Sequence, residues 1–376
     1  MTETAAKALP KTGRAAQRDS NLELLRILCM FFIVADHFSG QSLAAETAST
    51  ATICFYAVLK CGSRVGCSVF VMISAWFMCD GSFKMERVLR LWLTTLCYTV
   101  PLTLLCLFLP GVEVGWRDVV NAFLPVSGTP LWFTAYFILM SFASPFLNLL
   151  LRRLSQKQLR WILGGVAVPL VVYPTLTANI GIFQSDIVTM LFIYLLTGYL
   201  KRYPVAVTGR RGLLLGVMLG GQAVLTAWRA ISMIYGAGGA FRYVEMYRSQ
   251  FRTLPNLVIA LAAFYWFKGL AMPRSRVING LSATMLGVYV FHQVPCFSAF
   301  LWNGIFHTET YNGDPRQMAY SLFVVAATFM AGVVIELLRL RVVQPRVERM
   351  RIYRMAADKG DEIVGGIVRA VEEVKR

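Results

Sequence analysis

The chain has 376 residues, of which 57% are hydrophobic and only 15% are charged. Soluble proteins carry about 25% charged residues, so this composition excludes an ordinary soluble enzyme and indicates a membrane protein. The formal net charge is +17. We interpret it as a topology signal and expect no nucleic-acid partner, because nucleic-acid binders are not proteins with many membrane spans.

Several apolar segments approach the length of a transmembrane helix, which needs about 20 largely apolar residues. Ten candidates follow one another along the chain, at residues 23–40, 62–79, 89–109, 130–150, 161–178, 184–200, 212–233, 255–271, 280–301 and 318–338. The sequence therefore predicts an all-α fold, a polytopic transmembrane helical bundle of about ten spans embedded in the lipid bilayer. An even number of spans places both termini on one side, and the distribution of Lys and Arg makes that side cytoplasmic. We expect a multi-pass protein of the inner (plasma) membrane.

Three regions are predicted. Residues 1–20 form a basic cytoplasmic N-terminal tail, residues 21–340 form the membrane domain, and residues 341–376 form a cytoplasmic C-terminal tail. In that last region Ile363, Ile367 and Val371 recur at helical spacing, which indicates an amphipathic helix, either on the inner leaflet or solvated. The sequence leaves the formation of a homo-oligomer open.

Two ionisable residues in the first segment are functional candidates, because such side chains are costly inside a membrane. Arg26 and His37 are eleven residues apart. At about 100° per residue this separation is three turns plus about 20°, so both side chains lie on one helix face about 16 Å apart. The alternative is that Arg26 extends to the lipid headgroups and that His37 is a hydrogen-bonded packing residue.

A basic pair stands at the start of the third predicted span. Arg87 and Arg90 share a helix face at the i, i+3 spacing. Two neighbouring guanidiniums suit a phosphate, because each offers planar bidentate donors. The competing interpretation is ordinary anchoring of a cytoplasmic helix end by positive charge.

Aromatic and histidine side chains mark two later segments. Trp132 lies at the outer mouth of the fourth predicted span, and Tyr289 shares a helix face with His292 in the ninth. Counted from the inner face, His292 and His37 both lie about 20 Å deep. These three later residues are candidates for substrate binding. The alternatives are an aromatic packing stripe and a core histidine with satisfied hydrogen bonds.

The remaining polar features are less specific. The eight cysteines show no CxxC spacing, so no metal site is predicted. The outer loop at residues 242–252 mixes arginines with tyrosines, which suits an anionic or glycan ligand, although solvation of a loop explains it equally well.

Taken together, these segments resemble the acyltransferase-3 family of integral-membrane acyltransferases, which modify bacterial surface polysaccharides and other envelope molecules. The resemblance covers most of residues 18–340. Its strongest part is Arg26 followed by ten residues and His37, similar to an Arg-x10-His motif of the family; Arg87-Val-Leu-Arg90 is similar to its Arg-x-x-Arg pair. The segments around Trp132 and Tyr289 to His292 fit weaker patterns, and Ala75 replaces a glycine that is common in the family.

The resemblance implies an activity and assigns roles. The donor would be a cytoplasmic acyl-CoA, expected to be acetyl-CoA, and the acceptor a hydroxyl of an envelope glycan or lipid-linked glycan. Arg26, Arg87 and Arg90 would bind the phosphates of the donor, and His37 would be the general base. Direct transfer needs no metal; an acyl-histidine intermediate is an alternative.

A rival interpretation is a transporter or flippase for a lipid-linked glycan, because intramembrane Arg, His and Asp also line permeation paths. That class predicts broken helices with Gly or Pro interruptions in matching positions of two halves, and we expect none in this sequence. A receptor without catalytic activity would leave the basic pair and the deep histidines unexplained.

Overall fold

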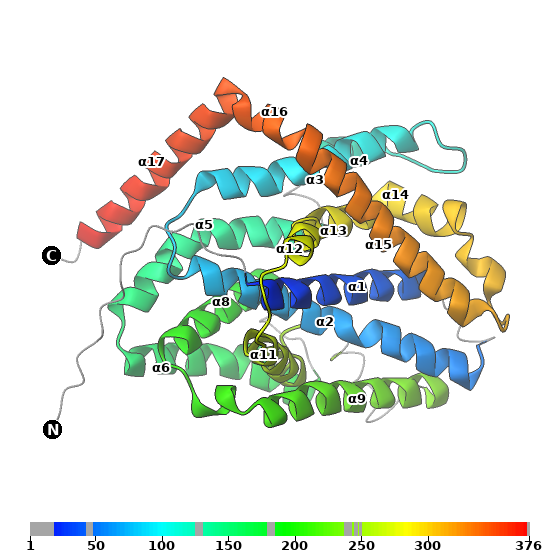
Figure 1. Cartoon of the computed structure of the whole chain (residues 1–376), viewed down its shortest axis with the longest axis horizontal. Helices are drawn as coiled ribbons and strands as arrows, with labels where there is room; N and C mark the ends of the chain where they lie inside the picture. The colour runs from blue at the N-terminus through cyan, green and yellow to red at the C-terminus, as the bar shows by residue number, and fades with distance from the viewer. Residues whose placement is uncertain are drawn as a thin grey trace.

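The computed structural model describes residues 19–42, 48–124, 131–178, 185–236 and 250–373, together with residues 243 and 247, and this part of the chain is helical without β-strands. Figure 1 shows the helices packed into one bundle, with α1 in its centre. The first half contains α1 (Ser20–Ser42), α2 (Thr50–Met78), α3 (Met85–Cys106), α4 (Trp116–Phe123), α5 (Trp132–Arg153), α6 (Gln156–Ala167), the π-helix η1 (Val168–Val172), α7 (Tyr173–Thr177) and α8 (Asp186–Arg202).

The second half combines a few long helices with a run of short ones between residues 276 and 311. It contains the 3₁₀ helix η2 (Ala206–Gly209), α9 (Arg211–Tyr235), α11 (Leu254–Lys268), α12 (Arg276–Ser282), α13 (Met285–Gln293), α14 (Pro295–Ala299), the π-helix η4 (Phe300–Ile305), the 3₁₀ helix η5 (Thr308–Tyr311), α15 (Gln317–Val342), α16 (Gln344–Arg349) and α17 (Arg351–Glu373).

The helical class agrees with the sequence prediction, but the count of ten spans is not confirmed. Six helical stretches of the described chain are long and apolar enough to cross a membrane, or seven if the bent pair at residues 276–305 is one span. The others fall short for physical reasons. The helix α8 has 17 residues and α11 has 15, whereas α1 has 23 residues but includes Glu23, Arg26 and Asp36.

The second helix begins earlier than its hydropathy predicts. The expected span started at residue 62, whereas α2 starts at Thr50, where the Ser49 side chain accepts a hydrogen bond from the Thr52 amide. This N-cap satisfies one of the free amides of the first turn. Lys60, which precedes the expected span, and Arg64 near its start therefore belong to a continuous helix of 29 residues.

The ninth predicted span is not straight. The stretches Arg276–Gln293 and Pro295–Ile305 are bent by 79° relative to each other. Pro295 lacks an amide hydrogen and restricts the residue before it, and Val294 is accordingly in an extended conformation (φ −62°, ψ 121°). We did not consider this proline in the sequence and expected a straight span over residues 280–301; a single bend does not test the expectation that matching breaks in two halves are absent.

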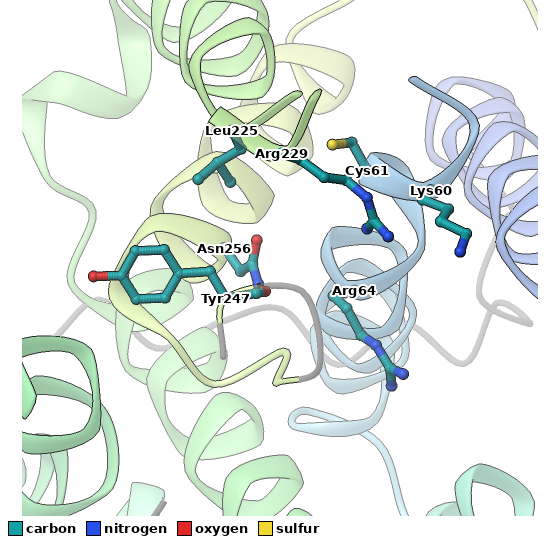
Figure 2. A pocket seen from close by; sticks show the side chains of 7 residues that line it. All are labelled: Lys60, Cys61, Arg64, Leu225, Arg229, Tyr247 and Asn256. Carbon is teal, nitrogen blue, oxygen red and sulfur yellow. Dashed lines mark hydrogen bonds between the residues drawn. The ribbon is translucent and has the colours of Figure 1, made fainter. Parts of the chain in front are cut away.

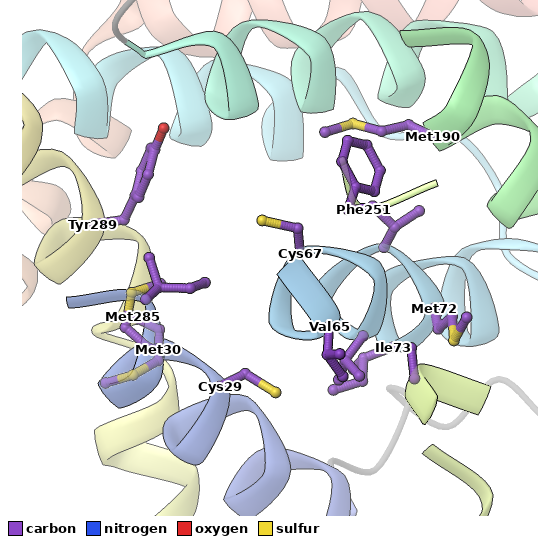
Figure 3. Packing of buried hydrophobic residues seen from close by; sticks show 14 of the residues in the cluster. Cys29, Met30, Val65, Cys67, Met72, Ile73, Met190, Phe251, Met285 and Tyr289 are labelled. Atoms are coloured by element: carbon purple, nitrogen blue, oxygen red, sulfur yellow. The ribbon is translucent and has the colours of Figure 1, made fainter. Parts of the chain in front are cut away.

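Close packing of α1 on α2 brings the two motif-bearing helices together. Gly62 and Gly66 lie four residues apart on α2, and a Cβ added at Gly66 would stand 3.2 Å from the Cβ of Cys29. Small residues at this spacing let membrane helices approach closely. Cys29 and Val65 belong to the buried cluster of Figure 3, which joins the two helices.

We therefore expect Gly66→Leu to destabilise the protein by about 1–3 kcal/mol, because a larger side chain must push α1 away from α2. Thermal melting of the full chain in detergent would measure this effect. Gly216→Leu on α9 is the matched control, since nothing lies within 4 Å of a Cβ at that position. Equal melting temperatures for the two variants would show that the fold does not depend on this close approach.

The last helix, α17, runs across one end of the bundle (Figure 1). Asp361 accepts a hydrogen bond from the Met85 amide at 2.6 Å and pairs with Lys84 at 3.2 Å. Ile363 and Ile367 on the same helix are exposed. The helix α17 is thus held where the loop of residues 79–84 leads into α3, and it presents apolar side chains outward. We call this the 79–84 end of the bundle.

Candidate active site

A large internal cavity connects most of the predicted site residues. Its volume is about 600 Å³, which is in the range of sites for small molecules. The predicted residues that line it are Arg26, His37, Arg87, Arg90, Trp132 and Tyr289. They come from α1, α3, α5 and α13, so the packing of four helices brings residues from distant parts of the sequence to one space. Arg26 and His37 of α1 face the same cavity, as their helical spacing predicts.

The seventh predicted residue, His292, lies behind His37. The Nδ1 atom of His37 is 2.8 Å from the Nε2 atom of His292, although the two residues are 255 positions apart. His292 is fully buried, and it packs beside Trp302 with ring centroids 6.3 Å apart. His292 therefore contacts the His37 ring, and in this position it can orient that ring.

The hydrogen bonds fix which nitrogen carries each proton. The Nδ1 atom of His292 is 2.6 Å from the Val288 carbonyl oxygen. A carbonyl only accepts, so Nδ1 of His292 must donate and, in the neutral ring, its Nε2 must accept. His37 then donates from Nδ1, which leaves the Nε2 lone pair of a neutral His37 ring available as a base. This is the orientation that a general base requires.

A second cavity lies toward the 79–84 end of the bundle. Its volume is about 410 Å³, and its lining includes Lys84. The two cavities share Arg26, Ser74, Arg87, Leu91 and Phe137 as lining residues. Arg87 thus stands where the two spaces meet, and among the described residues none forms an ion pair with it.

Arg90 and Arg26 differ from Arg87 because each is held by carboxylates. Arg90 pairs with Glu86 at 2.6 Å and with Glu348 at 2.7 Å. Arg26 pairs with Glu23 at 2.8 Å, and the same Glu23 carboxylate accepts a hydrogen bond from Ser282. Arg87 and Arg90 are therefore not an equivalent pair of guanidiniums, since Arg90 also joins α3 to α16.

Aromatic side chains line the cavity near His37. The ring centroids of His37 and Tyr289 are 6.4 Å apart, and Phe133 meets Tyr289 edge to face at 6.0 Å. Trp132 stacks on Phe251 at 5.8 Å. Trp132 and Tyr289 both line the cavity that His37 faces, so they are placed to contact a substrate that reaches this imidazole.

Sequence reasoning missed polar residues of this cavity. Glu336 is buried in α15, where it pairs with Arg339 at 2.7 Å and accepts a hydrogen bond from Tyr98 at 2.9 Å. Charged residues inside an apolar segment are the signal that would have found this pair. Arg64 also lines the cavity, and the same signal, a cation inside a predicted span, would have found it.

The described chain is thus helical, and one cavity brings a histidine and several guanidiniums together. The model of the acyltransferase-3 family, which describes an acyltransferase domain, matches residues 19–337. The chain therefore belongs to that family. No curated protein and no solved structure matches the chain. The family identifies a membrane acyltransferase, and the resemblance found in the sequence is confirmed.

Proposed function

We propose that this protein transfers an acyl group, acetyl in the first instance, from cytoplasmic acyl-CoA to a hydroxyl of an envelope glycan or lipid-linked glycan at the inner membrane. The observation that carries the proposal is the continuous lining of one cavity from Arg87 to His37. The cation Arg87 at one end of this cavity suits the phosphates of the donor, and the base His37 at the other end suits the attack of a hydroxyl.

The donor would enter from the 79–84 end, which the charge distribution assigns to the cytoplasm. Arg87 and Lys84 line the cavity at this end and would hold the phosphates of the nucleotide. The pantetheine arm would then extend along the face of α1 from Arg26 to His37, a rise of about 16 Å. In this arrangement the thioester reaches His37 while the nucleotide stays at the membrane surface.

The chemical step follows from the state of His37. Its Nε2 atom accepts the proton of the acceptor hydroxyl while the oxygen attacks the thioester carbonyl carbon. When the tetrahedral intermediate collapses, the carbon–sulfur bond breaks, the acceptor becomes an ester, and the CoA thiolate leaves with the proton that the imidazole returns. His292 keeps Nδ1 of His37 protonated throughout, and Trp132 and Tyr289 hold the acceptor beside the thioester.

Envelope glycans from cells with and without the gene provide the direct test. We expect mass spectrometry to show the loss of one acetyl increment per modified site when the gene is deleted, and its return when the gene is restored. Restoration with His37→Ala is the matched control and should fail to return the increment. Identical glycan masses in all strains would contradict the proposed acceptor class.

A transporter for a lipid-linked glycan is the second candidate, and the bend after His292 favours it, because broken helices often form binding sites in transporters. Acyl transfer by purified protein from acetyl-CoA to a sugar in detergent, where no compartments exist, separates the two activities. A transporter would show no transfer under these conditions.

A further inference from the structure

A third and smaller pocket lies between α2, α9 and α11 and is rich in basic side chains (Figure 2). Lys60 and Arg64 come from α2, Arg229 from α9, and Asn256 from the first turn of α11. Three cations at one pocket inside a membrane domain are costly, since each loses hydration there. Such a cluster points to a ligand or partner of negative charge.

A further guanidinium is buried in the segment that leads into α11. Arg252 lies four residues before Asn256 and has no exposed surface, and Arg229 is only 3% exposed. Within the described part of the chain, the Nε, Nη1 and Nη2 atoms of Arg252 have no hydrogen-bond partner. Buried polar groups are almost always hydrogen-bonded, so an orphaned guanidinium requires an explanation such as a bound anion.

One carboxylate near these side chains interacts with two of the arginines. Asp186, at the start of α8, interacts electrostatically with both Arg252 and Arg64. Lys60 and Arg229 add further positive charge to the pocket. A bound oxyanion would supply charge-assisted hydrogen bonds, which are about twice as strong as neutral ones.

Arg64 connects this pocket to the reaction cavity. It lines both spaces and interacts electrostatically with His37. The pocket has a volume of about 30 Å³, compared with about 600 Å³ for the reaction cavity. It exceeds the roughly 10–15 Å³ that one water needs but admits only a group of a few atoms. A small charged substituent fits here while the body of the acceptor stays beside His37.

We propose that the pocket of Arg64 and Arg229 binds the oxyanion of an acidic acceptor, a carboxylate or a phosphate on a sugar, and thereby orients its hydroxyl toward His37. The inference rests on the proposed function, because it names the class of acceptor for that reaction. It predicts that acidic sugars are preferred over neutral ones.

Binding of sodium glucuronate, glucose 1-phosphate and glucose to the full purified chain at equal ionic strength tests this proposal. We expect one or both acidic sugars to bind at least about tenfold more tightly than glucose, since a charge-assisted hydrogen bond contributes about 1.5–3 kcal/mol. Whichever acidic sugar binds more tightly identifies the preferred oxyanion as a carboxylate or a phosphate. Arg64→Gln and Arg229→Gln should remove this preference, and Arg64→Lys should retain part of it.

Arg316→Gln is the control, because Arg316 is exposed and pairs with Asp314 at 2.8 Å, away from the pocket. It should leave the preference unchanged. Equal binding of all three sugars by the unmodified protein would overturn the inference without relying on any variant, and so would an unchanged preference in folded Arg64→Gln. Acetyl-CoA binding by the unmodified protein, measured beside its preference among the sugars, separates the two proposals. Acetyl-CoA binding without acid preference rejects the pocket alone, whereas acid preference without acetyl-CoA binding rejects the proposed function.

Discussion

His37→Gln is expected to lower the rate of acyl transfer by about 10²–10⁴-fold, the usual contribution of a general base. Glutamine preserves much of the volume and hydrogen-bonding capacity of histidine, but it does not take up a proton near neutral pH. Transfer from radiolabelled acetyl-CoA to an acceptor sugar by purified protein measures the effect. Acetyl-CoA binding should persist in this variant, because the phosphate contacts that we propose lie near Arg87, in another part of the cavity.

Near-normal transfer by a folded His37→Gln protein would contradict the base assignment. The same preparation also distinguishes the two chemical routes that the sequence left open. Stoichiometric release of CoA by the unmodified protein in the absence of an acceptor, with label retained on the chain, would replace direct transfer by an acyl-histidine intermediate.

His292 offers a second measurement on the same pair. His292→Phe leaves the Nδ1 proton of His37 without its acceptor, so the ring is free to adopt the other tautomer and orientation. His292→Gln keeps an acceptor oxygen and should retain more activity than His292→Phe. A residue that served only for packing would rank the two variants the other way, because phenylalanine packs better in an apolar core.

Local patterns in the sequence were sufficient to predict that Arg26 and His37 share a helix face, since helical periodicity fixes which residues of one helix lie together. They were also sufficient for the family, because its motifs are short segments. The pairing of His37 with His292 could not be predicted, because it depends on how α1 packs against α13. The two residues are 255 positions apart in the sequence. Equal depth in the membrane was the only hint.

The errors have common physical causes. Hydropathy marked the start of the second span at residue 62, because Lys60 lowers the mean. Both Lys60 and Arg64 are nevertheless tolerated inside α2, where they line a pocket. Pro295 was read as part of a straight span although it breaks the helix. The partner of Arg90 on α16, Glu348, could not be foreseen from the spacing of the Arg87 and Arg90 pair.

Because of that partner, substitutions of Arg87 and Arg90 are expected to affect acetyl-CoA binding to different extents. Arg87→Gln is expected to weaken acetyl-CoA binding by at least about tenfold, because it removes the charge-assisted phosphate contact that we propose where the two cavities meet. Arg90 already pairs with Glu86 and Glu348. Arg90→Gln should therefore weaken binding less and act on stability, since it removes a link between α3 and α16.

Isothermal titration of acetyl-CoA into each purified variant, with melting temperatures of the same samples, separates these effects. Arg117→Gln is a matched control, because Arg117 lies at the start of α4 and stacks on Trp116, outside both cavities. High salt should reduce the affinity of the unmodified protein more than that of Arg87→Gln, as a screened phosphate contact requires. Equal and unchanged affinities in Arg87→Gln and Arg90→Gln would return both residues to the role of positive anchors at the membrane surface, and the donor would then have to be held by Arg26 and Lys84.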